Sequence, residues 1–121
     1  MKPEVHHLDT LQEFYISEGC YIVELTNSAA EGDVSVARAR VEPGVTTKWH
    51  FLEGTVERYV IVEGAGRVEV GDLDPQNVAP GDCVIIPAEC RQRITNNGEN
   101  DLIFLAICSP RFVPENYREE R

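Results

Sequence analysis

The chain has 121 residues, of which 42% are apolar, enough for one modest core and one domain over residues 1–121. Its 11 basic and 21 acidic residues give a net charge of −10, which argues against nucleic-acid or anionic-membrane partners. The longest apolar run, Leu102 to Cys108, has seven residues and is too short to cross a bilayer. No apolar stretch of a secretory signal follows the N-terminus, so we expect a cytoplasmic protein.

The chain begins with one short helical signal and continues as a series of strand-length segments. The helical turn is expected at residues 9–13, with Asp9 or Thr10 as its cap. Turns containing Gly, Pro or Asn then separate segments rich in β-branched and aromatic residues, namely 21–26, 34–41, 46–51, 57–63, 68–70, 83–86, 92–95 and 102–108. The tail, residues 114–121, is expected to be a solvated end. Many short strands between tight turns predict an all-β sandwich or closed barrel.

Alternation within these segments supports the strand assignment. In segment 34–41, Arg38 and Arg40 lie on one face, and the opposite face carries only small or apolar residues. We expect the arginine face to be solvated or salt-bridged, in preference to an anion site. The unbroken apolar segment 102–108 predicts a strand that is covered on both faces.

The four cysteines, Cys20, Cys83, Cys90 and Cys108, are widely separated and form no Cys-x-x-Cys pair. This spacing argues against a structural zinc site and favours reduced thiols. Cys83 and Cys108 lie in apolar strand segments and are expected in the core. Cys90 is expected near a pocket rim as an unreactive thiol, because the sequence shows no basic partner for it.

Strand parity also predicts a polar constellation on faces that would converge inside a barrel. Glu57 and Tyr59 share one face of their strand, while His50 comes from the preceding strand and Gln92 from a later one. If these faces meet, an imidazole, a carboxylate and an amide oxygen lie together in a mostly apolar cavity. We therefore predict a pocket lined by His50, Glu57 and Gln92, with Tyr59 pointing into it.

The spacing of these residues resembles two motifs of the cupin superfamily. The first motif, over residues 43–64, combines Pro43-Gly44 with His50, Glu57 and Gly64, and the second, over residues 81–96, combines Gly81 with Pro87, Gln92 and Asn96. From Pro43 to Asn96 the match spans nearly half of the chain. The resemblance implies a single-domain double-stranded β-helix, a jelly-roll-like barrel, that binds a small molecule. A homodimer is the family expectation.

Three positions depart from the family pattern. Leu52 replaces the second histidine of the first motif, Glu89 replaces a glycine of the second, and Gln92 replaces its histidine. The resemblance therefore implies a reduced metal set, His50, Glu57 and Gln92. One imidazole with carboxylate and amide oxygens favours iron, manganese or nickel over zinc, and a site without metal is an equal alternative.

Each candidate residue also has a purely structural interpretation. His50, Glu57 and Gln92 would satisfy one another as a buried polar network without any metal. Tyr59 would serve as a core residue with a satisfied hydroxyl, or else as a proton carrier. His6-His7 lies outside both motifs and is interpreted as a surface pair.

Three functions remain open from the sequence. The first is a metal-dependent oxidoreductase, isomerase or lyase that uses Glu57 or Tyr59 to carry a proton. The second is a metal-free module that binds or senses a small polar ligand without catalysis. The third is a sugar-nucleotide isomerase or epimerase with His50 as base, for which Lys48 and Arg93 are the only apparent diphosphate partners. The fold itself does not select among them.

Overall fold

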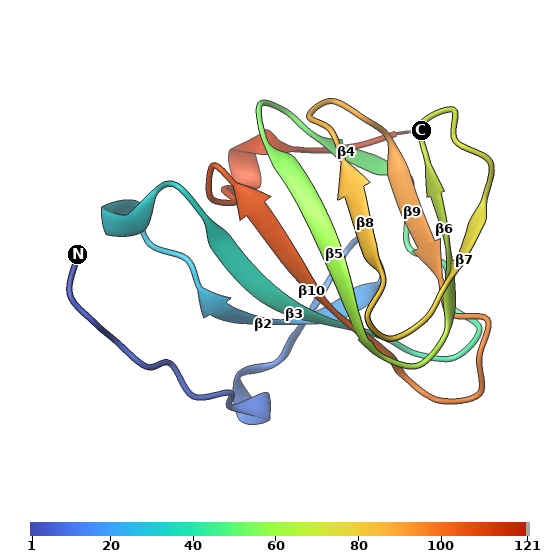
Figure 1. The fold of residues 1–121 in the computed structure, drawn as a ribbon, viewed down its shortest axis with the longest axis horizontal. Coiled ribbons are helices and arrows are strands. Elements are labelled where there is room, and N and C mark those ends of the chain that lie inside the picture. Colours follow the sequence, from blue (N-terminus) through green and yellow to red (C-terminus); the bar gives the residue numbers. More distant parts are fainter. Residues whose placement is uncertain (121) are drawn as a thin grey trace.

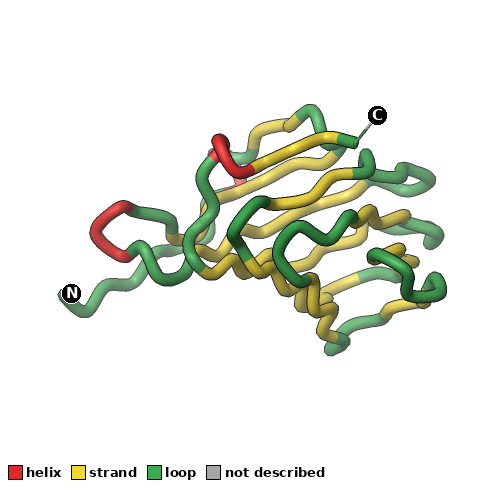
Figure 2. The backbone as a smooth tube through the Cα atoms, turned by 90° about the horizontal axis from the view of Figure 1, so that it is seen from above, coloured by secondary structure: helices red, strands yellow, loops and turns green. Residues whose placement is uncertain are grey.

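The computed structural model describes residues 1–120 and consists of two antiparallel sheets. The six-stranded sheet has the order β1-β2-β3-β10-β5-β8, and the five-stranded sheet has the order β11-β4-β9-β6-β7. The two sheets form a barrel, from which β2, β3 and the N-terminal arm extend to one side (Figure 1). Seen from above, the arm projects away from the barrel (Figure 2). The regular secondary structure of the described chain is therefore mainly β-strand, as the sequence predicts.

The strands and short 3-10 helices have the following bounds: η1 (Thr10–Gln12), β1 (Phe14–Ile16), β2 (Cys20–Thr26), η2 (Ala29–Glu31), β3 (Ser35–Val41), β4 (His50–Leu52), β5 (Val56–Glu63), β6 (Gly66–Val70), β7 (Gln76–Val78), β8 (Cys83–Ile86), β9 (Gln92–Thr95), β10 (Leu102–Ser109), η3 (Pro114–Asn116) and β11 (Tyr117–Glu119). Asp9 caps η1 as predicted, because its side chain accepts from the backbone N–H of Leu11. No helix within residues 1–120 is both long and apolar enough to cross a membrane.

The core lies between the two sheets and is formed by alternate residues of their inner faces. Ile61 and Phe104 come from the six-stranded sheet, Val68 and Ile94 come from the other, and all four are buried. On the outer face of β3, Arg40 forms an ion pair with Glu13 at 2.7 Å. The alternation that the sequence shows in β3 therefore separates core from surface, and its arginine face is salt-bridged.

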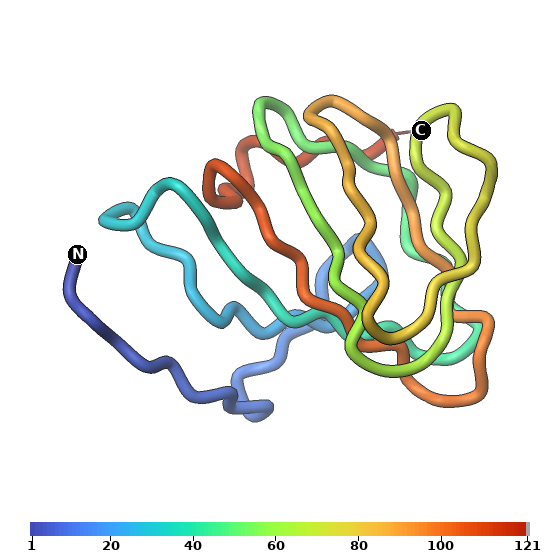
Figure 3. The backbone as a smooth tube through the Cα atoms, in the orientation of Figure 1, coloured from blue at the N-terminus to red at the C-terminus, as the bar shows by residue number. Residues whose placement is uncertain are grey.

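Within the expected solvated tail, Arg118 to Glu120 are exposed, but Tyr117–Glu119 form β11, which pairs with β4; the C-terminal stretch can be followed across the barrel in Figure 3, and residue 121 lies outside the described residues. The expectation for Cys83 is wrong. Cys83 is exposed, because it lies on the outward face of the edge strand β8. In addition, segment 46–51 forms regular strand only from His50 onward, with one isolated bridge between Thr46 and Thr95.

The asparagine of the second motif closes the loop that follows β9. Asn96 is fully buried, and its amide donates to the carbonyls of Val41 and Asn100 at 2.9 and 2.8 Å. Its side-chain oxygen accepts from the Gly98 N–H at 2.9 Å. All the hydrogen-bonding groups of Asn96 in this loop serve the backbone, so its role in the described structure is to hold β9 against β3.

We expect Asn96→Ala to destabilise the fold by about 2–4 kcal/mol, because it removes the donor to the buried Val41 carbonyl and two further hydrogen bonds of the loop. Urea unfolding followed by circular dichroism measures the loss. Asn97→Ala, at the exposed neighbouring position, is the control and should change stability by less than about 0.5 kcal/mol. Equal effects of the two substitutions would contradict this role of Asn96.

Candidate functional site

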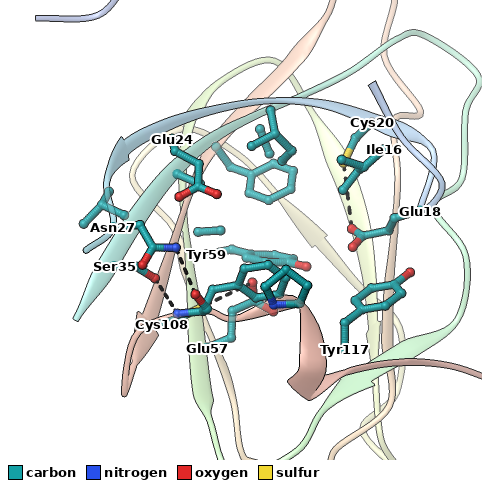
Figure 4. A pocket seen from close by; sticks show the side chains of 18 of the residues that line it. Ile16, Glu18, Cys20, Glu24, Asn27, Ser35, Glu57, Tyr59, Cys108 and Tyr117 are labelled. Carbon is teal, nitrogen blue, oxygen red and sulfur yellow. Dashed lines mark hydrogen bonds between the residues drawn. The ribbon is translucent and has the colours of Figure 1, made fainter. Parts of the chain in front are cut away.

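A pocket of about 440 Å³ lies over the inner face of the six-stranded sheet. It is lined by Phe14, Ile16, Ser17, Glu18, Cys20, Ile22, Glu24, Asn27, Ser35, Val36, Ala37, Ala39, Glu57, Tyr59, Phe104, Ala106, Cys108, Phe112, Pro114 and Tyr117. Most of these residues are alternate positions of β1, β2, β3, β5 and β10, and the C-terminal stretch closes one side (Figure 4). Its size suits a small organic molecule.

Glu57 lies in the wall of this pocket and is only 8% exposed. Its Oε1 accepts from Gln92 Nε2 at 2.8 Å, and its Oε2 lies 3.7 Å from the Cys108 thiol, a weak donor. Burial, followed by the negative charge of Glu18, raises the pKa of Glu57 to about 7. A carboxyl group whose pKa lies near 7 exists in both its protonated and its ionised form at physiological pH. It can therefore either donate or accept a proton.

Glu18 is a second buried carboxyl group in the same pocket, and sequence reasoning missed it. It lies in the turn between β1 and β2, where its carbonyl accepts from the Lys48 N–H at 2.8 Å. This contact brings Glu18 Oε1 to 3.4 Å from His50 Nε2. Burial raises the pKa of Glu18 to about 7, despite a weak opposing contact with the Cys20 thiol.

His50 is 2% exposed and is oriented by its own strand. Its Nδ1 lies 2.8 Å from the Lys48 carbonyl, which can only accept, so Nδ1 carries the proton and Nε2 of the neutral ring is an acceptor. Desolvation lowers the pKa of His50, which favours this neutral form. The ring stacks on Tyr117 with a centroid distance of 5.3 Å.

Tyr59 points into the pocket, as predicted, and its ring packs against Phe104 with a centroid distance of 4.3 Å. Burial first, and then the charges of Glu57 and Glu18, raise the pKa of Tyr59 well above its ordinary value. The hydroxyl therefore stays protonated at neutral pH. It can donate a hydrogen bond to a bound molecule, but it is a poor base.

The predicted trio is brought together only in part. Glu57 lines the pocket with Tyr59, but His50 and Gln92 do not; they contact its wall from behind, through Glu18 and Glu57. The expectation that all three line the pocket is therefore wrong for His50 and Gln92. Cys90 is also absent from the described lining.

The candidate diphosphate and surface residues, and the tryptophan beside His50, lie outside the pocket. Trp49 packs under the guanidinium groups of Arg91 and Arg93, at 4.0 and 4.3 Å from its ring centroid. Arg93 also forms an ion pair with Glu69 at 2.9 Å, so it is not held ready for a diphosphate. His6 is exposed and contacts the Leu25 carbonyl.

A metal ion does not fit the predicted trio as these side chains stand. Within residues 1–120, no group of three or more His, Cys, Asp or Glu side chains is arranged to hold one. Gln92 turns its N–H toward Glu57, whereas a ligand must present its oxygen. Its Oε1 is buried without a donor in the described structure, and this orphaned acceptor is the one feature that a cation would satisfy.

The signals for the missed pocket residues differ in strength. Glu24 lies on the same face of β2 as Cys20 and Ile22, and all three line the pocket, so strand parity alone was sufficient to find it. Glu18 lies in a turn outside both motifs, and Tyr117 lies in the tail. For these two residues, the sequence offers no comparable signal.

Comparison with known proteins gives a family and a fold. Residues 37–108 match the family model described as Cupin domain, whereas no curated protein matches the chain significantly. The solved structure of KdgF from Halomonas sp. is 18% identical with a TM-score of 0.78, and the match covers 90% of this chain and 96% of that protein. Pac13, described as a unique nucleoside dehydratase, is 16% identical with a TM-score of 0.77, covering 100% of this chain and 92% of Pac13.

A third solved structure belongs to a longer protein. The oxalate decarboxylase of Lactobacillus farciminis, in complex with formate, is 21% identical with a TM-score of 0.75. The match covers 88% of this chain and 32% of that protein. At these identities, the three structures show a shared double-stranded β-helix fold and no more.

Proposed function

This chain belongs to the cupin family, and we propose that it binds a small organic molecule and transfers a proton on it without a metal. The observation that carries the proposal is a pair of glutamates, Glu18 and Glu57, both about nine-tenths buried in the wall of one pocket. Burying two carboxyl groups costs free energy that packing alone does not repay. Such a pair is typical of functional sites.

Glu57 is the proposed proton carrier. The 2.8 Å hydrogen bond from Gln92 fixes one oxygen, and its raised pKa matches the pH at which a general acid or base works best. Tyr59 would donate a hydrogen bond to the group on which negative charge develops. Isomerisation and elimination both proceed through such a step, so the reaction class is that of an isomerase or lyase.

The experiment is hydrogen exchange with the solvent. The protein is incubated in D₂O with a panel of small hydroxy acids, sugars, nucleosides and amines, and mass spectrometry detects deuterium in each compound. We expect at least one compound to gain deuterium with the unchanged protein and with Glu63→Gln, an exposed glutamate of β5, but not with Glu57→Gln. Compounds that bind without exchanging would identify a binding module in place of an enzyme.

A metal-dependent reaction is the second candidate, and the orphaned Gln92 Oε1 favours it. Turning the Gln92 amide would present this oxygen to a cation beside Glu57. Elemental analysis of protein prepared without chelators, beside His50→Ala, separates the two candidates. Near-stoichiometric iron, manganese or nickel that disappears in the variant would support the metal-dependent reaction and overturn the first proposal.

A further inference from the structure

The charged groups around the pocket all have one sign. Glu18, Glu24 and Glu57 approach it from three sides (Figure 4), and none of its described lining residues is Lys, Arg or His. The net charge of −10 reinforces this local field and would draw cations toward the pocket. An anionic ligand would meet three carboxyl groups and no compensating charge.

Of the two buried carboxyl groups, Glu18 lacks a strong hydrogen-bond donor within the described structure. Glu18, only 9% exposed, has just the Cys20 thiol at 3.8 Å and the His50 ring. Since His50 Nδ1 donates to the Lys48 carbonyl, Nε2 of the neutral ring has no proton to offer Glu18. A carboxylate accepts about four hydrogen bonds, so the ionised form of Glu18 leaves acceptor positions open for a bound molecule or for water.

Asn27 and Ser35, two other possible acceptors in the pocket, are already engaged by the protein itself. The amide of Asn27 donates to the Phe112 carbonyl at 2.9 Å and accepts from Arg111 at 3.0 Å. The Ser35 hydroxyl accepts from the Phe112 N–H at 2.9 Å. The acceptors left for a ligand are therefore mainly carboxylates.

Aromatic rings form much of the rest of the lining. Phe14, Tyr59, Phe104, Phe112 and Tyr117 all contribute to the pocket wall. The faces of such rings attract an ammonium group while their surface accepts an apolar body. Carboxylates together with aromatic rings are the usual recognition surface for an organic cation.

We propose that the pocket selects a molecule with one ammonium group on an apolar or aromatic body, and that the ammonium lies beside Glu18 and Glu57, with Glu24 adding negative charge from another side of the pocket (Figure 4). This inference rests on the proposed small-molecule function and names its substrate class. The ammonium provides the N–H donors that Glu18 lacks, and its charge offsets the repulsion between buried carboxylates. The apolar body occupies the aromatic part of the pocket.

The test compares three probes of similar shape by isothermal titration calorimetry at pH 7.5: 2-phenylethylamine, 2-phenylethanol and 3-phenylpropanoate. We expect the amine to bind roughly tenfold or more tightly than the alcohol, because charge-assisted hydrogen bonds are the stronger ones, and we expect no binding of the carboxylate. Equal affinity for amine and alcohol, preference for the carboxylate, or no binding of any probe at millimolar concentration would overturn the inference.

Isosteric variants assign the recognition to its residues. Glu18→Gln and Glu57→Gln should each weaken amine binding by roughly tenfold and leave alcohol binding unchanged, Glu24→Gln should weaken it less, and Glu63→Gln should change neither. Circular dichroism confirms that each variant is folded, and unchanged amine affinity in folded Glu18→Gln and Glu57→Gln would contradict the proposal. Deuterium exchange into a sugar or hydroxy acid, but not into any amine, would overturn this inference while sustaining the proposed proton transfer.

Discussion

At pH 8, Glu57→Gln is expected to be more stable than the unchanged protein, and this advantage should disappear near pH 4. In the folded protein the pKa of Glu57 is raised to about 7, whereas the ordinary pKa of a glutamate, which applies in the unfolded chain, is 4.5. Between these values the folded state binds more protons than the unfolded state, so stability falls as pH rises through this window and is level above it. Glutamine carries no charge at any pH and avoids this loss.

The groups that face Glu57 determine the size of the effect. Burial and then Glu18 raise its pKa, whereas the hydrogen bond from the Gln92 amide, the positive charge that His50 carries when protonated and the Cys108 thiol lower it. A folded pKa of about 7 corresponds to a gain of at most about 3 kcal/mol for the variant at pH 8. Glu18→Gln should behave alike, since its pKa is raised to about the same value. The two gains should not add fully, because each carboxylate repels the other.

Urea unfolding at several pH values between 4 and 8 measures this prediction as the difference between variant and parent. Taking the difference removes contributions from other groups, such as the Glu13–Arg40 ion pair, that are the same in both proteins. Glu63→Gln should show a difference near zero throughout. A Glu57→Gln advantage that is independent of pH, or that grows toward low pH, would show that Glu57 is already ionised in the folded protein.

The sequence predicts the strands wherever alternation and turn residues agree. β2, β5, β8, β9 and β10 are found within one residue of their expected ends. The missed strands β1, β7 and β11 have three residues each and lie at or near sheet edges. Segments this short show no clear period, and they become strands only by pairing with longer neighbours.

Burial within a strand was harder to predict than the strand itself. Cys83 and Ile85 are exposed, whereas Val84 and Ile86 are buried. All four residues are apolar, so composition gives no sign of the outward face. The position of β8 at the edge of the six-stranded sheet determines which of its faces is exposed. That position depends on strand pairing across the whole chain.

In the candidate site, too, the sequence predicts the residues that a local strand pattern places, but not those that long-range contacts place. Parity correctly placed Glu57 and Tyr59 on one inward face, because they belong to one strand. The sequence does not predict that Glu18 lines the pocket, because its position depends on the β1–β2 turn lying against the chain near Lys48. Such long-range contacts, not local pattern, also decide that His50 meets Glu18 behind the pocket wall.

Gly64→Ala, in the turn between β5 and β6, is expected to destabilise the fold by roughly 4 kcal/mol. Gly64 has a φ of +85°, and an added Cβ would lie 2.6 Å from the Asp101 carbonyl oxygen and 3.0 Å from the Leu102 Cα. Both atoms belong to the backbone at the start of β10, so no side chain can move aside. The positive φ costs about 1–2 kcal/mol for alanine, and displacing packed backbone costs a further 1–3 kcal/mol. Urea unfolding measures the total.

Gly81→Ala separates the two contributions to this loss. Gly81 has a similar φ of +94°, but an added Cβ would have no atom within 4 Å. Its substitution should therefore cost only the conformational part, about 1–2 kcal/mol. The remaining loss in Gly64→Ala would measure how tightly the β5–β6 turn is packed on β10, which also carries Phe104 and Cys108 into the pocket wall. If the two variants lose the same stability, close packing does not explain the glycine at position 64.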